Sequence, residues 1–140
     1  MKVSYLLVAL FGMLAFEASA QSECANYKKE GSLFSGRRFT NWDIVPVSPD
    51  VAMKRIKIEA VGSGLILKAE DKDAGLLVFE QHLSGGTGQI TMPSNVVVTP
   101  EGKAASKVAV TRTVPSGYAT GEGYQRESLC FLINAAYGKK

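Results

Sequence analysis

Histidine and cysteine are scarce in this chain of 140 residues, which limits the chemistry that it can support. His82 is the only histidine, and the two cysteines, Cys24 and Cys130, lie far apart in the sequence. Zinc sites need several Cys or His ligands at short, regular spacing, and no such set is present. A catalytic pair of His82 with Ser84 would place the nucleophile at the start of a glycine-rich turn. We therefore expect a protein that is not an enzyme and that carries no metal or cofactor.

The carboxylates also lack the pattern of a metal or catalytic site. Asp71 and Asp73 resemble the start of a calcium loop, but the twelfth position, where such a loop carries a glutamate, is His82. An acid–base pair for glycan cleavage needs two carboxyl groups roughly 5–9.5 Å apart in a cleft. Lysines lie among the neighbouring carboxylates and favour a solvated surface; these residues are Lys68, Glu70, Lys72 and Glu80. A small envelope hydrolase that uses the carboxylates or His82 therefore ranks last among the alternatives.

Charge and phosphate-binding motifs give no support for nucleic-acid or nucleotide binding. The formal net charge is +3, and like charges occur in runs of no more than two, as in Arg37-Arg38. Nucleic-acid binding usually needs a clustered basic surface. The glycine-rich residues 85–88 lack the Gly-Lys-Ser/Thr of a phosphate-binding loop. We expect no nucleic-acid partner.

The first twenty residues have the pattern of a cleaved signal peptide. Lys2 precedes an apolar run, Tyr5–Phe16, and Ala18-Ser19-Ala20 supplies the small residues of a cleavage site. The run is shorter than the ~20 residues that span a bilayer, so no transmembrane segment is expected after cleavage. Cys24 follows Gln21-Ser22-Glu23 rather than a lipobox, which argues against a lipid anchor. The predicted location is the periplasm or the exterior of the cell.

In such an oxidising compartment, two cysteines are expected to pair. A disulfide between Cys24 and Cys130 would close a loop of more than a hundred residues. On the chain-entropy account, such a loop contributes on the order of 4–5 kcal/mol to stability. The predicted layout is a signal peptide (1–20), an N-terminal arm with little regular structure (21–35) and a single α+β domain (36–140).

Apolar periodicity and turn residues predict strand, helix, four strands and helix. Ser48 and Pro49 form a helix start, and Asp71–Gly75 provides the polar turn of a hairpin. The predicted elements are a strand at Gly36–Val47, a helix at Pro49–Ala60, a hairpin at Leu65–Leu83, a bulged or edge strand at Gln89–Val98, a strand at Ala104–Val114 and a helix from Glu122 or Tyr124 to Tyr137. This order predicts an antiparallel sheet of about five strands with two helices on one face, a two-layer α+β sandwich.

Residue spacing also predicts which side chains are buried. In the predicted strand at Ala104–Val114, three valines alternate with Lys107, Ala109 and Thr111; these valines are Val108, Val110 and Val114. In the last helix Leu129, Leu132, Ile133 and Ala136 share an apolar face. The polar residues Gln125, Arg126, Glu127 and Asn134 are expected to lie off that face.

The stretch that begins with the helix at Pro49 resembles a known family. A Pro-started helix followed by LILKAEDKDAGLLVFEQ is similar to the helix-grip small domains of bacterial envelope proteins, of which the BamC-type outer-membrane assembly lipoproteins are members. The similarity covers Trp42–Leu83 and the strands that follow. It implies a helix-grip-like sandwich that serves as a non-catalytic scaffold or binding module. The chain departs from BamC-type proteins in having no lipobox, one domain and a predicted disulfide.

Aromatic and basic residues outside the predicted core are the candidates for a binding surface. Trp, Tyr and Arg are enriched at interface hot spots, and the candidates are Arg37, Arg38, Trp42, Gly86, Tyr118 and Tyr124. The predicted function is contact with another exported or envelope protein, as an assembly factor or as an inhibitor or immunity-type protein. The alternative is binding of a lipid, glycan or small acid in a groove between the helices and the sheet.

Overall fold

The computed structural model describes residues 24–85 and 88–138. The predicted signal peptide (1–20) and Gly86 lie outside these residues. The elements, in chain order, are β1 (Lys28–Ser32), β2 (Gly36–Val45), α1 (Pro49–Gly62), β3 (Ile66–Asp71), β4 (Leu76–Gly85), β5 (Gly88–Glu101), β6 (Ala105–Val114) and α2 (Glu122–Tyr137).

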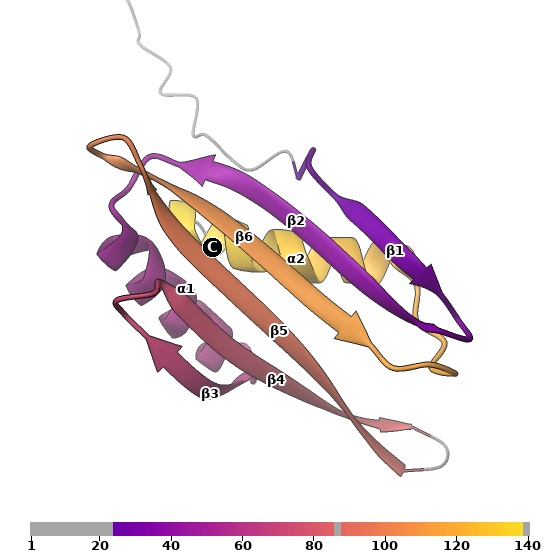
Figure 1. The fold of residues 1–140 in the computed structure, drawn as a ribbon. Coiled ribbons are helices and arrows are strands. Elements are labelled where there is room, and N and C mark those ends of the chain that lie inside the picture. Colours follow the sequence, from indigo (N-terminus) through magenta and orange to yellow (C-terminus); the bar gives the residue numbers. More distant parts are fainter. Residues whose placement is uncertain (1–23, 86–87, 139–140) are drawn as a thin grey trace, which may run out of the picture.

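The strands form one antiparallel sheet in the order β1-β2-β6-β5-β4-β3. Both helices lie on the same face of this sheet and contact each other (Figure 1). The chain is therefore a helix-grip-like two-layer α+β sandwich, as predicted. The sheet has six strands rather than about five.

The additional strand is β1, which corrects the prediction of an irregular arm over residues 21–35. Residues Lys28–Ser32 pair with β2, from Lys28 opposite Thr40 to Ser32 opposite Gly36. All five side chains of β1 are exposed, so they show no apolar alternation that would indicate a strand. Backbone pairing with β2 orders this segment at the edge of the sheet.

The prediction of a bulged or edge strand at Gln89–Val98 is wrong for the half that begins at Ser94, whereas residues 89–93 have one neighbouring strand. β5 pairs without a register shift to β4 on one side and, from Ser94 onward, to β6 on the other. Pro93 lies in the part of β5 that has only β4 as a neighbour. A proline lacks the N–H that a second neighbour would need, so its position is consistent with the pairing.

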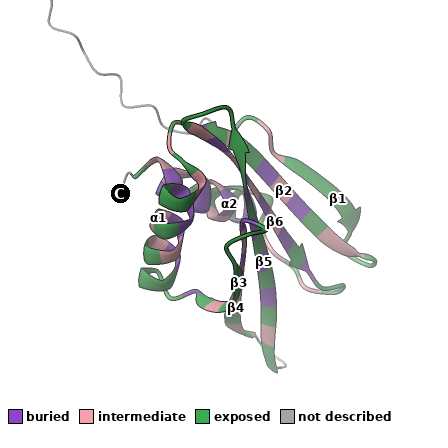
Figure 2. Ribbon diagram, turned by 60° about the vertical axis from the view of Figure 1, so that its left-hand side comes forward, coloured by how far each residue is buried: buried purple, intermediate pink, exposed green. Residues whose placement is uncertain are grey.

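The core lies between the helices and the inner face of the sheet, where Figure 2 shows the buried residues. The predicted apolar stripe of α1 is confirmed: Ala52, Met53, Ile56 and Ala60 are buried. The predicted apolar face of α2 is confirmed as well, since Leu129, Leu132, Ile133 and Ala136 are buried. Gln125 corrects the prediction for that helix, because it is fully buried one turn before Leu129.

The hairpin between β3 and β4 turns as predicted. Asp71 Oδ1 accepts a hydrogen bond from the backbone N of Ala74 at 2.9 Å, and Gly75 has a φ of 67°. This φ lies in the left-handed region, which glycine adopts without the penalty that a Cβ imposes. The Asx turn and the glycine together reverse the chain.

The disulfide between Cys24 and Cys130 is confirmed, with the two Cα atoms 5.8 Å apart. It ties the segment before β1 to α2. Disulfides persist in oxidising compartments and are rare in the cytosol, so the bond indicates a non-cytoplasmic location. Within residues 24–85 and 88–138, no helix is both long and apolar enough to cross a membrane.

Candidate functional site

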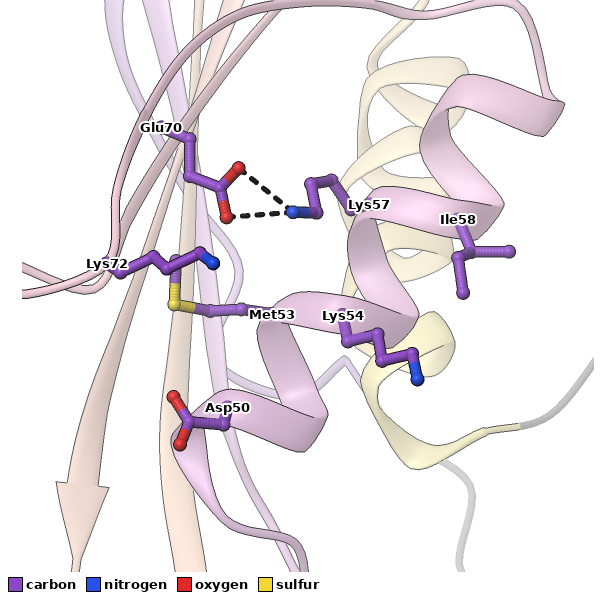
Figure 3. Close-up of a pocket in the computed structure, with 7 residues that line it drawn as sticks. All are labelled: Asp50, Met53, Lys54, Lys57, Ile58, Glu70 and Lys72. Atoms are coloured by element: carbon purple, nitrogen blue, oxygen red, sulfur yellow. Dashed lines mark hydrogen bonds and ion pairs between the residues drawn. The ribbon is translucent and has the colours of Figure 1, made fainter.

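One hollow that borders a helix lies between α1 and β3. It has a volume of about 620 Å³ and is lined by Asp50, Met53, Lys54, Lys57, Ile58, Glu70 and Lys72. Lys57 points toward β3 and donates to both carboxylate oxygens of Glu70 at 2.8 and 2.9 Å, whereas Lys54 and Ile58 point away from β3 (Figure 3). The ion pair within this hollow is already satisfied, so we regard a second hollow as the stronger candidate.

The second hollow, which we call the α2 pocket, lies between α2, the end of α1 and the inner face of the sheet. Its volume is about 300 Å³, and it is lined by Ser63, Leu65, Gln81, Arg112, Tyr124, Glu127, Ser128 and Phe131. Gln81 comes from β4, Arg112 from β6 and the last four residues from α2. Sequence-distant elements therefore meet at this site.

Arg112 lies at the centre of the sheet, on the face that the helices cover. In the strand register it is opposite Phe39 of β2 and Ser94 of β5, and only 2% of its surface is exposed. Its Nε donates to Ser94 Oγ at 2.8 Å. Among the described residues, Nη1 has no hydrogen-bond partner, and no carboxylate forms an ion pair with the guanidinium.

The environment of Arg112 opposes its charge without removing it. Burial lowers the pKa of the guanidinium, while the nearby Tyr124 phenol acts in the opposite direction. An arginine remains protonated in proteins because its ordinary pKa lies so far above neutrality. The protein therefore holds a positive charge in the wall of the α2 pocket, at a desolvation cost of several kcal/mol.

Polar and aromatic groups from β4 and α2 complete the α2 pocket. Gln81 Nε2 donates to Tyr124 Oη at 3.1 Å. Tyr124 and Phe131 are 45% and 38% exposed, which is high for aromatic side chains beside a core, and Leu65 is nearly buried between the helix and the sheet. The pocket thus combines apolar walls with a few convergent polar groups, the usual composition of a small-molecule site.

Gln125, which follows Tyr124 on α2, adds a second buried polar group near this region. Its Nε2 donates to Thr120 Oγ1 at 2.9 Å and lies 3.9 Å from Met92 Sδ. Its Oε1 is buried and has no hydrogen-bond partner within the described part of the chain. Buried polar atoms are nearly always paired. Beneath α2, however, one donor, Arg112 Nη1, and one acceptor, Gln125 Oε1, have no partner among the described residues.

Two of the predicted binding residues are tied together in a structural contact. Arg37 donates from Nη2 to the carbonyl of Tyr118 at 2.7 Å and from Nη1 to the carbonyl of Thr120 at 3.3 Å. The guanidinium also lies 5.7 Å from the centre of the Phe39 ring. Arg37 therefore holds the loop before α2 against β2.

The other predicted binding residues lie on two different surfaces. Trp42 is 38% exposed on the outer face of the sheet, where Lys107 Nζ lies 4.4 Å from its ring centre. Arg38 is exposed on the same strand. Tyr124 is the one candidate that lines the α2 pocket. The structure therefore does not join the described candidates into a single surface.

The residues considered for catalysis or metal binding show no site geometry. His82 Nε2 lies 3.5 Å from Glu80 Oε2, and no hydrogen bond joins it to Ser84 among the bonds of the described residues. Both His82 and Ser84 are exposed. Over residues 24–85 and 88–138, no group of three or more His, Cys, Asp or Glu side chains could hold a metal ion.

Arg112 was absent from the sequence-predicted site, although the sequence contains a signal for it. Val108, Val110 and Val114 alternate on the inner face of β6, and residue 112 shares their parity. A strict period of two places its side chain among the valines. The sequence therefore indicates an arginine beside the valines of this strand face, but it does not indicate which residues of the adjacent strands lie next to it.

Comparison with known proteins supports the fold alone. No protein-family model matches the chain, and no curated protein matches it significantly. A conserved protein of unknown function from Enterococcus faecalis, EF2215, shares the fold with a TM-score of 0.52 and 8% identity, over 79% of this chain and 74% of that one.

Two further structures are more distantly similar. TTHA0849 from Thermus thermophilus has a TM-score of 0.43 and 12% identity, over 72% of this chain and 94% of that one. The lipid transfer and protein localization domain of human StarD13 (DLC2) has a TM-score of 0.42 and 10% identity, over 95% of this chain and 98% of that one. Identities at this level support no transfer of site residues to this chain.

Proposed function

We propose that this protein is an exported, non-enzymatic binding domain that holds a small ligand in the α2 pocket. The observation that carries the proposal is the convergence of Gln81, Arg112 and Tyr124 on a hollow of about 300 Å³ whose surface as a whole is more apolar than polar. That volume lies at the lower end of the range for small-molecule sites, roughly 300–1,000 Å³. The expected ligand is therefore small.

The proposed location is the periplasm or the exterior of the cell. The signal-peptide pattern of residues 1–20 and the disulfide between Cys24 and Cys130 support it. The resemblance to BamC-type envelope domains stays a prediction. A binding domain within the envelope is consistent with that resemblance and needs no cofactor.

Thermal unfolding in the presence of lipids, glycans and small acids tests the proposal, because a ligand that binds the folded state raises the unfolding temperature. Ser128 lines the pocket from α2, so Ser128→Trp should fill it and abolish the shift. Ile58→Trp, on the exposed side of α1, is the matched control and should preserve the shift. If no compound in any class stabilises the wild-type protein, the proposal fails.

A second candidate function, contact with another exported protein, is supported by the outer face of the sheet. Four apolar residues lie side by side across four strands of this face: Trp42, Ala109, Val97 and Leu76. Trp42 and Val97 are exposed. An assembly factor, inhibitor or immunity-type protein would use such a row as its interface core.

The outer face can be tested separately from the pocket. Trp42 is the only tryptophan, so its fluorescence reports directly on contact at this face. A partner recovered from periplasmic extract should change that emission and should bind Val97→Lys poorly but Ser128→Trp normally. Equal binding to all three proteins would exclude this face as the interface.

A further inference from the structure

We propose that the α2 pocket selects small monocarboxylic acids with an apolar body, and that Arg112 is the counter-ion of their carboxylate. This inference rests on the function proposed above and specifies its ligand. It follows from three features of the described residues: an uncompensated buried charge, the balance of charges around the pocket and the apolar walls.

The first feature is the charge of Arg112. Arginine is seldom fully buried unless it is paired, and a buried charge is retained at a large desolvation cost. The hydrogen bond to Ser94 Oγ uses Nε, and the Tyr124 phenol lies within hydrogen-bond reach of the guanidinium, but Nη1 has no partner among the described residues. Since no carboxylate of the described residues pairs with it, an anion from outside the chain is the partner that the site lacks.

The second feature is the balance of charge, which favours a single negative charge on the ligand. Arg112 is the only positively charged residue that lines the pocket and Glu127 the only negatively charged one, and the two form no ion pair. A dianionic phosphate would meet one guanidinium and one repelling carboxylate. A carboxylate carries one charge and matches the planar fork of a guanidinium.

The third feature is the apolar wall. Leu65, Tyr124 and Phe131 line the pocket, and both aromatic side chains expose more than a third of their surface. A ligand with an apolar body would cover this surface, at a gain of about 25 cal/mol for each Å² removed from water. The hydroxyl of Tyr124 and the amide of Gln81, which bond to each other at 3.1 Å, lie beside it as further partners for the carboxylate.

The test is calorimetric titration of the mature protein, stripped of bound ligand by unfolding and refolding. The probes are octanoate and 4-phenylbutyrate, their neutral counterparts 1-octanol and 4-phenylbutanol, and octyl phosphate. We expect each acid to bind at least about tenfold more tightly than its alcohol. Arg112→Met should weaken binding of the acids by about 30-fold or more, since removal of one partner of a buried charge pair has an effect of this size, and should leave the alcohols unchanged.

Three variants identify the source of the selectivity. Glu127→Gln should tighten acid binding, because it removes the like charge from the pocket. Arg112→Lys keeps the charge but loses the planar fork, so its affinity for the acids should fall between those of Arg112→Met and the wild type. Arg38→Met, an exposed arginine on β2 outside the pocket, is the matched control and should bind the acids as the wild type does.

The possible failures are distinguishable. If acids and alcohols bind equally and Arg112→Met changes neither, the pocket takes neutral ligands; the inference is then wrong while the proposed function stands. Tighter binding of octyl phosphate than of octanoate overturns the assignment of a monocarboxylate. If no probe binds and the broader ligand set produces no thermal shift, both the inference and the proposed function fail.

Discussion

Replacing Arg112 with methionine should stabilise the ligand-free protein, although Arg112 is one of the largest fully buried side chains. A methionine resembles the aliphatic part of arginine and fills irregular gaps. The substitution removes a charge that has no ion-pair partner among the described residues. It therefore reverses the usual expectation that a change in the core is destabilising.

The expected magnitude follows from two opposing contributions. Replacing buried ionic groups with well-packed apolar residues stabilises proteins by about 1–4 kcal/mol in favourable cases. Against this, the bond from Arg112 Nε to Ser94 Oγ is lost and leaves a buried hydroxyl without its donor, which costs about 1 kcal/mol or slightly more. We expect a net increase of up to about 3 kcal/mol in the free energy of unfolding.

The measurement is urea unfolding of the stripped protein at pH 7, with the double variant Arg112→Met/Ser94→Ala as a second step. The double variant should be more stable again, because it also removes the unpaired hydroxyl. Arg37→Met is the matched control on the same face of the sheet. Its guanidinium donates to the carbonyls of Tyr118 and Thr120, so this substitution should destabilise by about 1–2 kcal/mol.

Arg112→Met is expected to raise the free energy of unfolding, whereas Arg37→Met is expected to lower it. If Arg112→Met lowers the free energy of unfolding as much as Arg37→Met does, the guanidinium of Arg112 is compensated in the ligand-free protein. The argument for an external anion would then lose its basis. If the Arg112→Met variant is instead more stable than the wild type and no longer binds acids, the protein maintains this site at the expense of stability.

Three further predictions concern the scaffold. Gly75 and Gly102 have nearly equal φ values of 67° and 68°, but only at Gly75 would a Cβ meet the backbone of the neighbouring strand; Gly75→Ala should therefore cost about 2 kcal/mol more than Gly102→Ala in urea unfolding. Cys130→Ser should lower the free energy of unfolding by on the order of 4–5 kcal/mol, and a reducing agent should lower the wild type equally. Burial, and next Asp43, raise the pKa of Tyr137 above its ordinary value of 10.0. The unfolded chain therefore ionises first as the pH rises through 10, so stability falls above pH 10, and Tyr137→Phe should reduce that fall.

The parts of the fold that could be predicted from the sequence are those determined by local signals. Ser48 and Pro49 mark the start of α1, and the stripe that includes Ile56 follows the helical period. Asp71 and Gly75 specify the reversal between β3 and β4 through an Asx bond and a positive φ. Each signal acts over a few residues, so it requires no knowledge of the partner strand.

β1 could not be predicted because its stability comes from a neighbour. Its sequence, KKEGS, has no apolar side chain, and all five residues are exposed. The hydrogen bonds to β2 and the disulfide just before the strand hold it in place. Such an edge strand is recognisable only when the strand beside it is known.

The site was predicted less well than the fold for a related reason. Tyr124 is the single candidate that proved to line the α2 pocket, and its exposure follows from its position on the first turn of α2. The parity of β6 places Arg112 on the inner face, but an arginine there can extend to water or remain buried. Its position between Phe39 and Ser94, in the middle of the sheet, decides in favour of burial.

The contacts that hold α2 explain how the pocket can keep an unpaired charge. The disulfide fixes the middle of α2 to the segment before β1. Arg55 of α1 donates to the carbonyls of Ala136 and Tyr137 at 3.2 Å each and so anchors the C-terminal end of the helix. Arg37 anchors the loop that leads into it. These contacts restrain the helix from moving away from the sheet and hydrating Arg112. Arg112 therefore stays desolvated in the ligand-free protein, and an anion that binds does not have to displace water from it. The site is preorganised for an anion.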